Sequence, residues 1–293
     1  MSREVKNKDI NRLRSYSSVF SSTPFSKIIK NGDLSFIEAR INRYDLDYLM
    51  SGKFYTYMDY LQHIYRELEK NYRNEYFYKN TFLNSILLNH YGIKDTIAIN
   101  EFRVGSSVAD LVLFNGSSKA FEIKTELDSN KRLKGQVKDY RKIFDECYVV
   151  TDESLIEKYA KEDLSVGIIA LRKTSRSVTM YEWRKAEKNT TIDPATLMRC
   201  LRTEEYKNIV KTFYGDLPEM NSFNMFPICS EIIKSIPPDE LSVLFLNQLK
   251  KRKSSTAFLK TFHKELRQLA LAMNLEKNKY DVLVDYLNRP INI

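Results

Sequence analysis

Two acidic residues and one lysine have the types and the spacing that metal-assisted hydrolysis of a phosphodiester requires. Asp110 lies in the apolar segment 109–114, and Glu122 and Lys124 lie two residues apart in the segment 121–125. Two carboxylates can share a divalent cation, and a lysine can stabilise negative charge on a reacting phosphate. Such chemistry needs the three side chains on one face of two neighbouring elements.

The two segments are expected to form a β-hairpin that brings these side chains together. Alternate residues of a strand face the same side, so Asp110 can join Glu122 only in one register. A three-residue loop, 115–117, gives this register and places Leu111 opposite Phe121. A symmetric two-residue loop would shift the register by one residue and mix the faces, which a half-buried hairpin resists. Asn-Gly at the start of the loop accepts the positive φ angles of such a turn.

Further elements can be predicted around this hairpin. The segment 96–102 is expected to be a strand with Glu101 near its end, and 131–144 a helix on which Gln136 and Tyr140 lie four residues apart. A helix around Glu75 precedes them. Another strand, helix and strand follow, at 147–152, 153–162 and 165–171.

This pattern resembles the PD-(D/E)XK nuclease superfamily, whose signature is an acid at the start of one strand and Glu-x-Lys on the next. The match is Asp110 with Glu122 and Lys124, and Ala109 replaces the usual proline before the first acid. A Gln-x-x-x-Tyr helix after Glu-x-Lys also recurs in this superfamily. The resemblance covers about residues 70–183. It implies an α/β fold with a restriction-endonuclease-like αβββαβ core, a mixed central sheet and helical flanking segments.

The resemblance also implies a role for each side chain. Mg²⁺ or Mn²⁺ would be bound by carboxylates and one main-chain carbonyl, namely those of Asp110, Glu122 and Ile123, with Glu75 and Glu101 as candidates to complete the site. Lys124 would orient the attacking water or stabilise the phosphate. Gln136 and Tyr140 would position water or phosphate.

Simpler interpretations exist for the same residues. Asp110, Glu122 and Lys124 could form a salt-bridge ladder on the surface. Glu101 could be a solvated strand end, and Glu75 a charge favoured by a helix N-terminus. Gln136 and Tyr140 could be ordinary residues of a helix surface.

The charge balance favours a polyanionic partner. The 293 residues include 47 Lys and Arg against 38 Asp and Glu, a formal net charge of +9. Basic residues cluster on the helix that follows Glu-x-Lys, and we expect Lys134, Lys138 and Arg141 to bind nucleic acid. The resemblance favours DNA over RNA.

Several classes of protein and site are disfavoured by what the sequence lacks. No run of about 18 apolar residues occurs, and the N-terminal segment has no apolar core of a signal peptide. The three cysteines are widely spaced, which argues for a reducing, cytoplasmic setting and against structural zinc. No glycine-rich phosphate loop suggests use of ATP.

The predicted organisation has three parts: a helical N-terminal segment (1–69), a nuclease core (70–190) and a helical C-terminal segment (191–293). The helical segments are candidates to hold a second copy or a partner protein. The function expected is that of a metal-dependent nuclease, an endonuclease, that hydrolyses phosphodiester bonds of nucleic acid. The resemblance favours defence against foreign DNA, as in phage defence, as its use, with DNA repair as the second use. The alternative is a nucleic-acid-binding or accessory protein with a nuclease-like fold and little activity.

Overall fold

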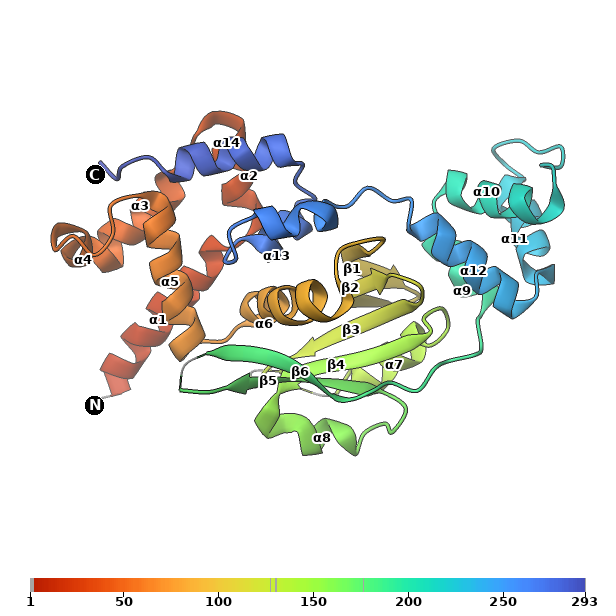
Figure 1. Ribbon diagram of the computed structural model, residues 1–293, viewed down its shortest axis with the longest axis horizontal. Helices are drawn as coiled ribbons and strands as arrows, with labels where there is room; N and C mark the ends of the chain where they lie inside the picture. The colour runs from red at the N-terminus through yellow and green to blue at the C-terminus, as the bar shows by residue number, and fades with distance from the viewer. Residues whose placement is uncertain (1–2, 127, 130, 176, 293) are drawn as a thin grey trace. The chain divides into compact units, whose positions relative to one another are not determined.

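The computed structural model describes residues 3–126, 128–129, 131–175 and 177–292. The chain forms two compact units (Figure 1). The first unit combines the residues up to Asn84 with those from Phe258 onward, and the second comprises Ser85–Ala257. In the part of the chain that the structure describes, no helix is long and apolar enough to cross a membrane.

The described part of the first unit is built from helices: α1 (Arg3–Val19), α2 (Ser22–Asn31), α3 (Ser35–Arg40), the π-helix η1 (Ile41–Asp45), α4 (Leu46–Met50), α5 (Tyr57–Asn71), α6 (Glu75–Phe82), α13 (Arg267–Ala272) and α14 (Lys277–Leu287). Helix α5 shows why such segments are helical. Thr56 and Asp59 cap its start with reciprocal hydrogen bonds. Its buried residues, including Leu61, Ile64 and Leu68, recur at helical spacing.

The second unit contains a six-stranded mixed sheet whose strands lie in the order of the sequence: β1 (Ile97–Val104), β2 (Ser107–Phe114), β3 (Ser118–Lys124), β4 (Glu146–Asp152), β5 (Gly167–Lys173) and β6 (Val178–Arg184). β3, β4 and β5 run parallel, and the other neighbouring pairs are antiparallel. This α/β architecture with a mixed sheet and flanking helices confirms the predicted fold class. The predicted order of elements is also observed, as α6, β1, β2, β3, α7 and β4.

The β2–β3 hairpin has the predicted register. Leu111 pairs with Phe121, and Gly116 in the connecting turn has a φ of +111°. The supposition of a half-buried hairpin was wrong, however, because every residue of β3 is buried. The register follows from the segregation of side-chain types between the two faces of the hairpin. A strand that is buried on both faces also requires this segregation.

Parallel strands need crossover connections, and helices supply them. α7 (Leu133–Tyr140) joins β3 to β4, while η3 (Glu153–Leu155) and α8 (Ile156–Ala160) join β4 to β5. Leu133 and Val137 of α7 share an apolar cluster with Ile156 of α8 and with Val149 and Ile168 of the sheet. This packing fixes the height and the rotation of α7 over the sheet.

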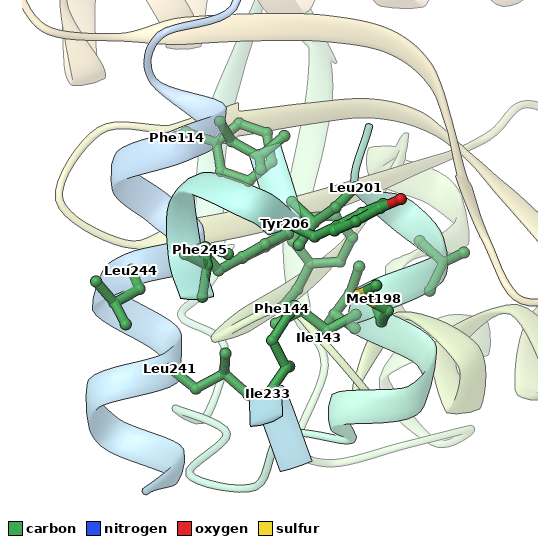
Figure 2. Packing of buried hydrophobic residues seen from close by; sticks show 14 of the residues in the cluster. Phe114, Ile143, Phe144, Met198, Leu201, Tyr206, Ile233, Leu241, Leu244 and Phe245 are labelled. Atoms are coloured by element: carbon green, nitrogen blue, oxygen red, sulfur yellow. The ribbon is translucent and has the colours of Figure 1, made fainter. Parts of the chain in front are cut away.

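Four helices follow the sheet in the sequence and share a buried cluster with β1 and β2: α9 (Pro194–Cys200), α10 (Thr203–Tyr214), α11 (Met225–Ser235) and α12 (Pro238–Leu249). Pro194 and Pro238 lie in the first turns of α9 and α12, where a proline removes no intrahelical hydrogen bond. Phe245 of α12 packs edge-on against Phe114 of β2 in a buried cluster (Figure 2). The two units therefore divide the segment predicted as 191–293, since α9–α12 belong with the sheet and α13–α14 with the first unit.

Candidate functional site

The carboxylate of Glu122 is the centre of a buried polar cluster in the second unit. Gln136 Nε2 donates a hydrogen bond to Glu122 Oε1 over 2.6 Å, and Tyr140 Oη lies 2.6 Å from Glu122 Oε2. Lys124 Nζ forms an ion pair with Glu122 Oε1 at 2.7 Å. The three side chains of Gln136, Tyr140 and Lys124 thereby fix the orientation of the two Glu122 carboxylate oxygens.

Lys124 is held in the same cluster by a second contact. Its Nζ donates to Gln136 Oε1 over 3.2 Å. The amide of Gln136 thus accepts from the lysine and donates to Glu122, which fixes the orientation of the amide plane. The predicted spacing of Glu122 and Lys124 on one face of β3 is therefore observed.

Asp110 joins the cluster from β2 through the main chain of β3. The N–H of Ile123 donates to Asp110 Oδ2 over 2.7 Å. This contact crosses the hairpin at the position that the predicted register requires. The structure therefore brings together five of the residues proposed as catalytic: Asp110, Glu122, Lys124, Gln136 and Tyr140.

Tyr140 is a constant hydrogen-bond donor at this site. Burial, together with the charge of Glu122 and the hydrogen bond to it, raises the pKa of Tyr140 well above its usual range. The hydroxyl therefore keeps its proton across the physiological pH range. It also lies 2.8 Å from Val108 O, so it connects α7 to the start of β2.

The cluster is not a ladder of surface ion pairs. Glu122 and Lys124 expose only 3% and 6% of their surface, and Tyr140 exposes 1%. Asp110 and Gln136 are half-buried and form the accessible side of the cluster. A buried ion pair with so many additional bonds costs desolvation energy that a solvated pair does not.

Glu101 has an unusual backbone at a position next to Asp110. The β1–β2 pairs Asn100–Leu111 and Phe102–Ala109 flank Glu101 and place it across from Asp110. Glu101 has a φ of +55° inside the strand, a conformation that costs a non-glycine residue on the order of 1–3 kcal/mol. The residue is exposed. Strain of this kind is often found at functional sites.

Glu75 lies at the start of α6 in the first unit. Its carboxylate forms an ion pair with Lys79 at 2.5 Å, and Lys79 is buried. This contact gives Glu75 a structural partner within its own helix. Its proposed contribution to a metal site stays a prediction.

The basic residues of α7 lie on the side of the helix away from Glu122. An α-helix turns by about 100° per residue, so Lys134 and Lys138 lie roughly 120–160° around the axis from Gln136 and Tyr140. Lys134 has a side chain that is 78% exposed and lies 3.6 Å from Glu162. Arg141 is half-buried and donates to Ser165 Oγ. Lys134, Lys138 and Arg141 share one side, and their binding of nucleic acid stays a prediction.

Sequence reasoning missed Asp139, which lies between Gln136 and Tyr140 on α7. Its carboxylate accepts hydrogen bonds from Ser106, in the turn between β1 and β2, and from Ser107, the first residue of β2. The sequence does contain a signal, because Gly105-Ser106-Ser107 has the composition of a tight turn. Nothing in the sequence pairs that turn with one particular acid.

The donor set of the cluster suits a hard divalent cation. The described residues contain no group of three or more His, Cys, Asp or Glu side chains arranged for a metal. Asp110 and Glu122 nevertheless supply carboxylate oxygens, and Mg²⁺ commonly binds through one or two carboxylates while keeping several waters. These two residues, with the main-chain carbonyl of Ile123, would hold such an ion.

Comparisons with known proteins identify a family for this chain. Residues 68–274 match the family described as bacteriophage P4 protein cII. The chain belongs to that family. Protein cII of Enterobacteria phage P4 is 30% identical over 124 residues, which are 41% of this chain and 47% of the relative, so the chain spans about half the length of that relative. A solved structure, the SPO1766 protein of unknown function from Silicibacter pomeroyi, is 11% identical, covers 43% of this chain and 86% of its own, and has a TM-score of 0.29.

Proposed function

We propose that this protein is a metal-dependent nuclease that hydrolyses phosphodiester bonds, with DNA as the favoured substrate. The observation that carries the proposal is the convergence of Asp110, Glu122 and Lys124 with Gln136 and Tyr140 in one cluster. These side chains come from two strands and one helix. Their types and arrangement are those that resemblance to the PD-(D/E)XK nucleases implies.

Each residue has a defined part in the proposed reaction. Mg²⁺ or Mn²⁺ bound at Asp110 and Glu122 would polarise the phosphate and lower the pKa of a bound water. Gln136 and Tyr140 hold the Glu122 carboxylate in one orientation. Lys124 supplies positive charge beside the reacting phosphate, where preorganised charge has its largest effect in a dry site.

The substrate class and the biological setting are extensions of this proposal. The net charge of +9 favours a polyanion. The relative protein cII belongs to Enterobacteria phage P4. We therefore propose that the protein acts in a phage or in a bacterial host, in the cytoplasm, on foreign DNA.

A second candidate function is nucleic-acid binding with little cleavage. The observation that favours it is the burial of Glu122 and Lys124 at 3% and 6% exposure, with both side chains engaged in hydrogen bonds. A metal would have to compete with these bonds. The same cluster would then stabilise the fold while a separate surface binds nucleic acid.

The two candidates differ in metal-dependent turnover. Labelled single- and double-stranded DNA and RNA are incubated with wild-type protein in Mg²⁺, Mn²⁺ or EDTA. The nuclease proposal expects cleavage with either metal and none in EDTA. Asp110→Asn and Glu122→Gln should abolish it, while retaining any binding measured by gel shift.

Asp145→Asn is the matched control. Asp145 is a half-buried carboxylate of the same sheet unit that accepts hydrogen bonds from Ser118 at the turn between β2 and β3. Its loss should leave cleavage near the wild-type rate. Robust cleavage in EDTA, or equal cleavage by Asp110→Asn and wild type, would overturn the metal mechanism. Salt-sensitive binding without cleavage would select the second candidate.

A further inference from the structure

The carboxylate of Asp139 ties α7 to the turn between β1 and β2. Ser106 Oγ and Ser107 Oγ each donate to Asp139 Oδ2 over 2.8 Å. Lys142 Nζ binds the other oxygen, Oδ1, at 2.8 Å. Asp139 exposes only 8% of its surface, while Ser106 is exposed and Ser107 is half-buried. Both carboxylate oxygens are thereby engaged.

The backbone of the turn is shaped to let this carboxylate approach. Gly105 has a φ of +58°, which glycine adopts without the penalty that other residues meet. A Cβ atom at this position would lie 3.3 Å from Asp139 Oδ1. The turn and the helix therefore fit each other closely at this point.

The next residue of α7 continues the attachment into the cluster around Glu122. Tyr140 Oη lies 2.8 Å from Val108 O and 2.6 Å from Glu122 Oε2. Asp139 and Tyr140 thus hold the consecutive β2 residues Ser107 and Val108. Asp110 follows two residues later on the same strand. The position of the Asp110 carboxylate relative to Glu122 accordingly depends on this attachment.

The charge of Asp139 makes the attachment firm. Burial opposes ionisation, but hydrogen bonds from Lys142, Ser107 and Ser106 and the charge of Lys142 outweigh it, and the pKa of Asp139 falls to about 2. The group is therefore fully ionised at neutral pH. Hydrogen bonds to an ionised acceptor are stronger than those between neutral groups.

We propose that Asp139, with Ser106 and Ser107, is a positioning device that sets the distance between the Asp110 carboxylate and the Glu122–Tyr140 pair. This inference rests on the proposed function for its catalytic consequence. Its structural part, the coupling of α7 to the first residues of β2, stands on the contacts alone. Misplacement of a reacting group by about 1 Å can cost two orders of magnitude in rate.

The same unit contains a matched attachment at the other end of β2. Asp145 Oδ2 accepts from the N–H and the Oγ of Ser118, at 2.7 and 2.9 Å. This aspartate–serine pair holds the turn between β2 and β3, next to Phe114, while the Asp139 pair holds the turn that leads to Asp110. Loss of the serine hydroxyls at either turn removes comparable bonds, but Ser107 lies three residues from Asp110 along β2, whereas Ser118 lies eight residues from Asp110 in the chain.

The test compares Ser106→Ala/Ser107→Ala with Ser118→Ala in the full-length protein. Steady-state cleavage of labelled DNA with Mg²⁺ should show kcat lowered roughly tenfold in the double variant, with KM within about twofold of wild type. Ser118→Ala should keep both constants within about twofold. Ser106→Thr/Ser107→Thr, which restores the hydroxyls, should recover most of kcat.

Hydrogen–deuterium exchange supplies a readout that does not depend on activity. The double alanine variant should accelerate exchange in both 107–110 and 133–141, while Ser118→Ala leaves both segments unchanged. If wild type cleaves nothing, the proposed function fails, and exchange alone decides the inference about coupling. Equal loss of kcat in both alanine variants, an unchanged kcat in the double variant, or unchanged exchange in 107–110 overturns the positioning role.

Discussion

The hydroxyl of Tyr140 lies 2.6 Å from Glu122 Oε2 and 2.8 Å from Val108 O. One side chain of α7 therefore contacts both strands that carry the acids of the cluster. The tyrosine ring is at the same time part of the apolar core with Phe144 and Phe114. Tyr140 thus links the packing of α7 in the core to the orientation of the buried Glu122 carboxylate.

Removing only the hydroxyl of Tyr140 should separate the packing of its ring in the core from the orientation of the Glu122 carboxylate. Tyr140→Phe keeps the ring and deletes the donor, so the free energy of unfolding should fall by about 1–3 kcal/mol. Cleavage should fall roughly tenfold or more, because Glu122 loses one of the groups that orient it. Urea denaturation and single-turnover cleavage with Mg²⁺ measure the two effects.

Tyr148→Phe is the matched control for this variant. Tyr148 Oη lies 2.8 Å from both Glu146 and Glu182, and its ring stacks on Phe121, on the face of the sheet opposite to Glu122. The variant should lose similar stability and keep its cleavage rate. If both tyrosine variants lose activity in proportion to stability, Tyr140 has no specific part in the reaction.

Two lysines of β3, each paired with a glutamate, allow a second prediction. Lys124 pairs with Glu122 on one face, and Lys119 pairs with Glu146 on the other, each at 2.7 Å. Truncation of one partner leaves a buried charge uncompensated, which costs about 3–5 kcal/mol. Lys124→Met and Lys119→Met should therefore destabilise the protein comparably, as measured by urea denaturation.

Activity should distinguish the two lysine variants. Lys124→Met should lower kcat by about two orders of magnitude or more, whereas Lys119→Met should retain cleavage at temperatures where it is folded. The double variant Lys124→Met/Glu122→Gln removes both charges and should recover stability without activity. Wild-type cleavage by Lys124→Met would exclude this lysine from the mechanism.

The core of the site was predictable because two short-range rules agree. Alternation along the strands and the length of the loop set the pairing of Leu111 with Phe121, and this pairing brings Asp110 to Glu122. The spacing of Gln136 and Tyr140 placed both on one face of a helix. The periodicity of strands and helices therefore made these contacts predictable, since it shows which residues share a face of one element.

The features that sequence analysis missed depend on contacts between distant elements. An amphipathic helix shows which face is buried but not what it packs on, so the contact of Phe245 with Phe114 could not be read from either segment. The positive φ of Glu101 was equally hidden, because glutamate has no preference for that conformation. The sequence does not distinguish Asp139 from the other acidic residues, because the turn that it binds lies far from it in the chain.

The strained backbone of Glu101 leads to a third prediction. Glycine accepts a φ of +55° without the steric cost that a Cβ brings. Glu101→Gly should therefore raise the free energy of unfolding by up to about 1 kcal/mol, after the greater entropy of an unfolded glycine is taken into account. Glu101→Ala, which keeps the Cβ, should give no gain.

Cleavage by these two variants tests whether the Glu101 carboxylate takes part in the reaction. Both variants lack the carboxylate, so both should lose activity if it contributes to the metal site across from Asp110. Full activity in both would make Glu101 a strained strand residue with no chemical role. A gain in stability by the alanine variant would argue against strain as the cause.

The ionised state of Asp139 predicts a stability loss in acid. Its pKa is about 2 in the folded protein and near 3.8 when unfolded, so the unfolded state binds the proton more readily. The stabilisation of the folded protein by ionised Asp139 is fully present above the pKa of the unfolded state, and it is lost as the pH falls through about 2. Its size is about 2 kcal/mol. Asp139→Asn should remove this contribution, so urea midpoints at about pH 5 and pH 2 should differ less in the variant than in wild type.

The last prediction concerns the exposed basic side of α7. Lys134 and Lys138 are exposed and lie away from the Glu122 cluster, whereas Arg141 is half-buried and bound to Ser165. If nucleic acid crosses this side, Lys134→Ala/Lys138→Ala should weaken binding and flatten its dependence on salt by roughly one unit per lost phosphate contact. Arg141→Ala should chiefly lower stability, because it removes a packed, hydrogen-bonded side chain. Fluorescence anisotropy over a range of salt concentrations measures the first effect and urea denaturation the second. An unchanged salt slope in the double lysine variant would mean that this side of α7 faces solvent and that the substrate approaches along Asp110 and Gln136 instead.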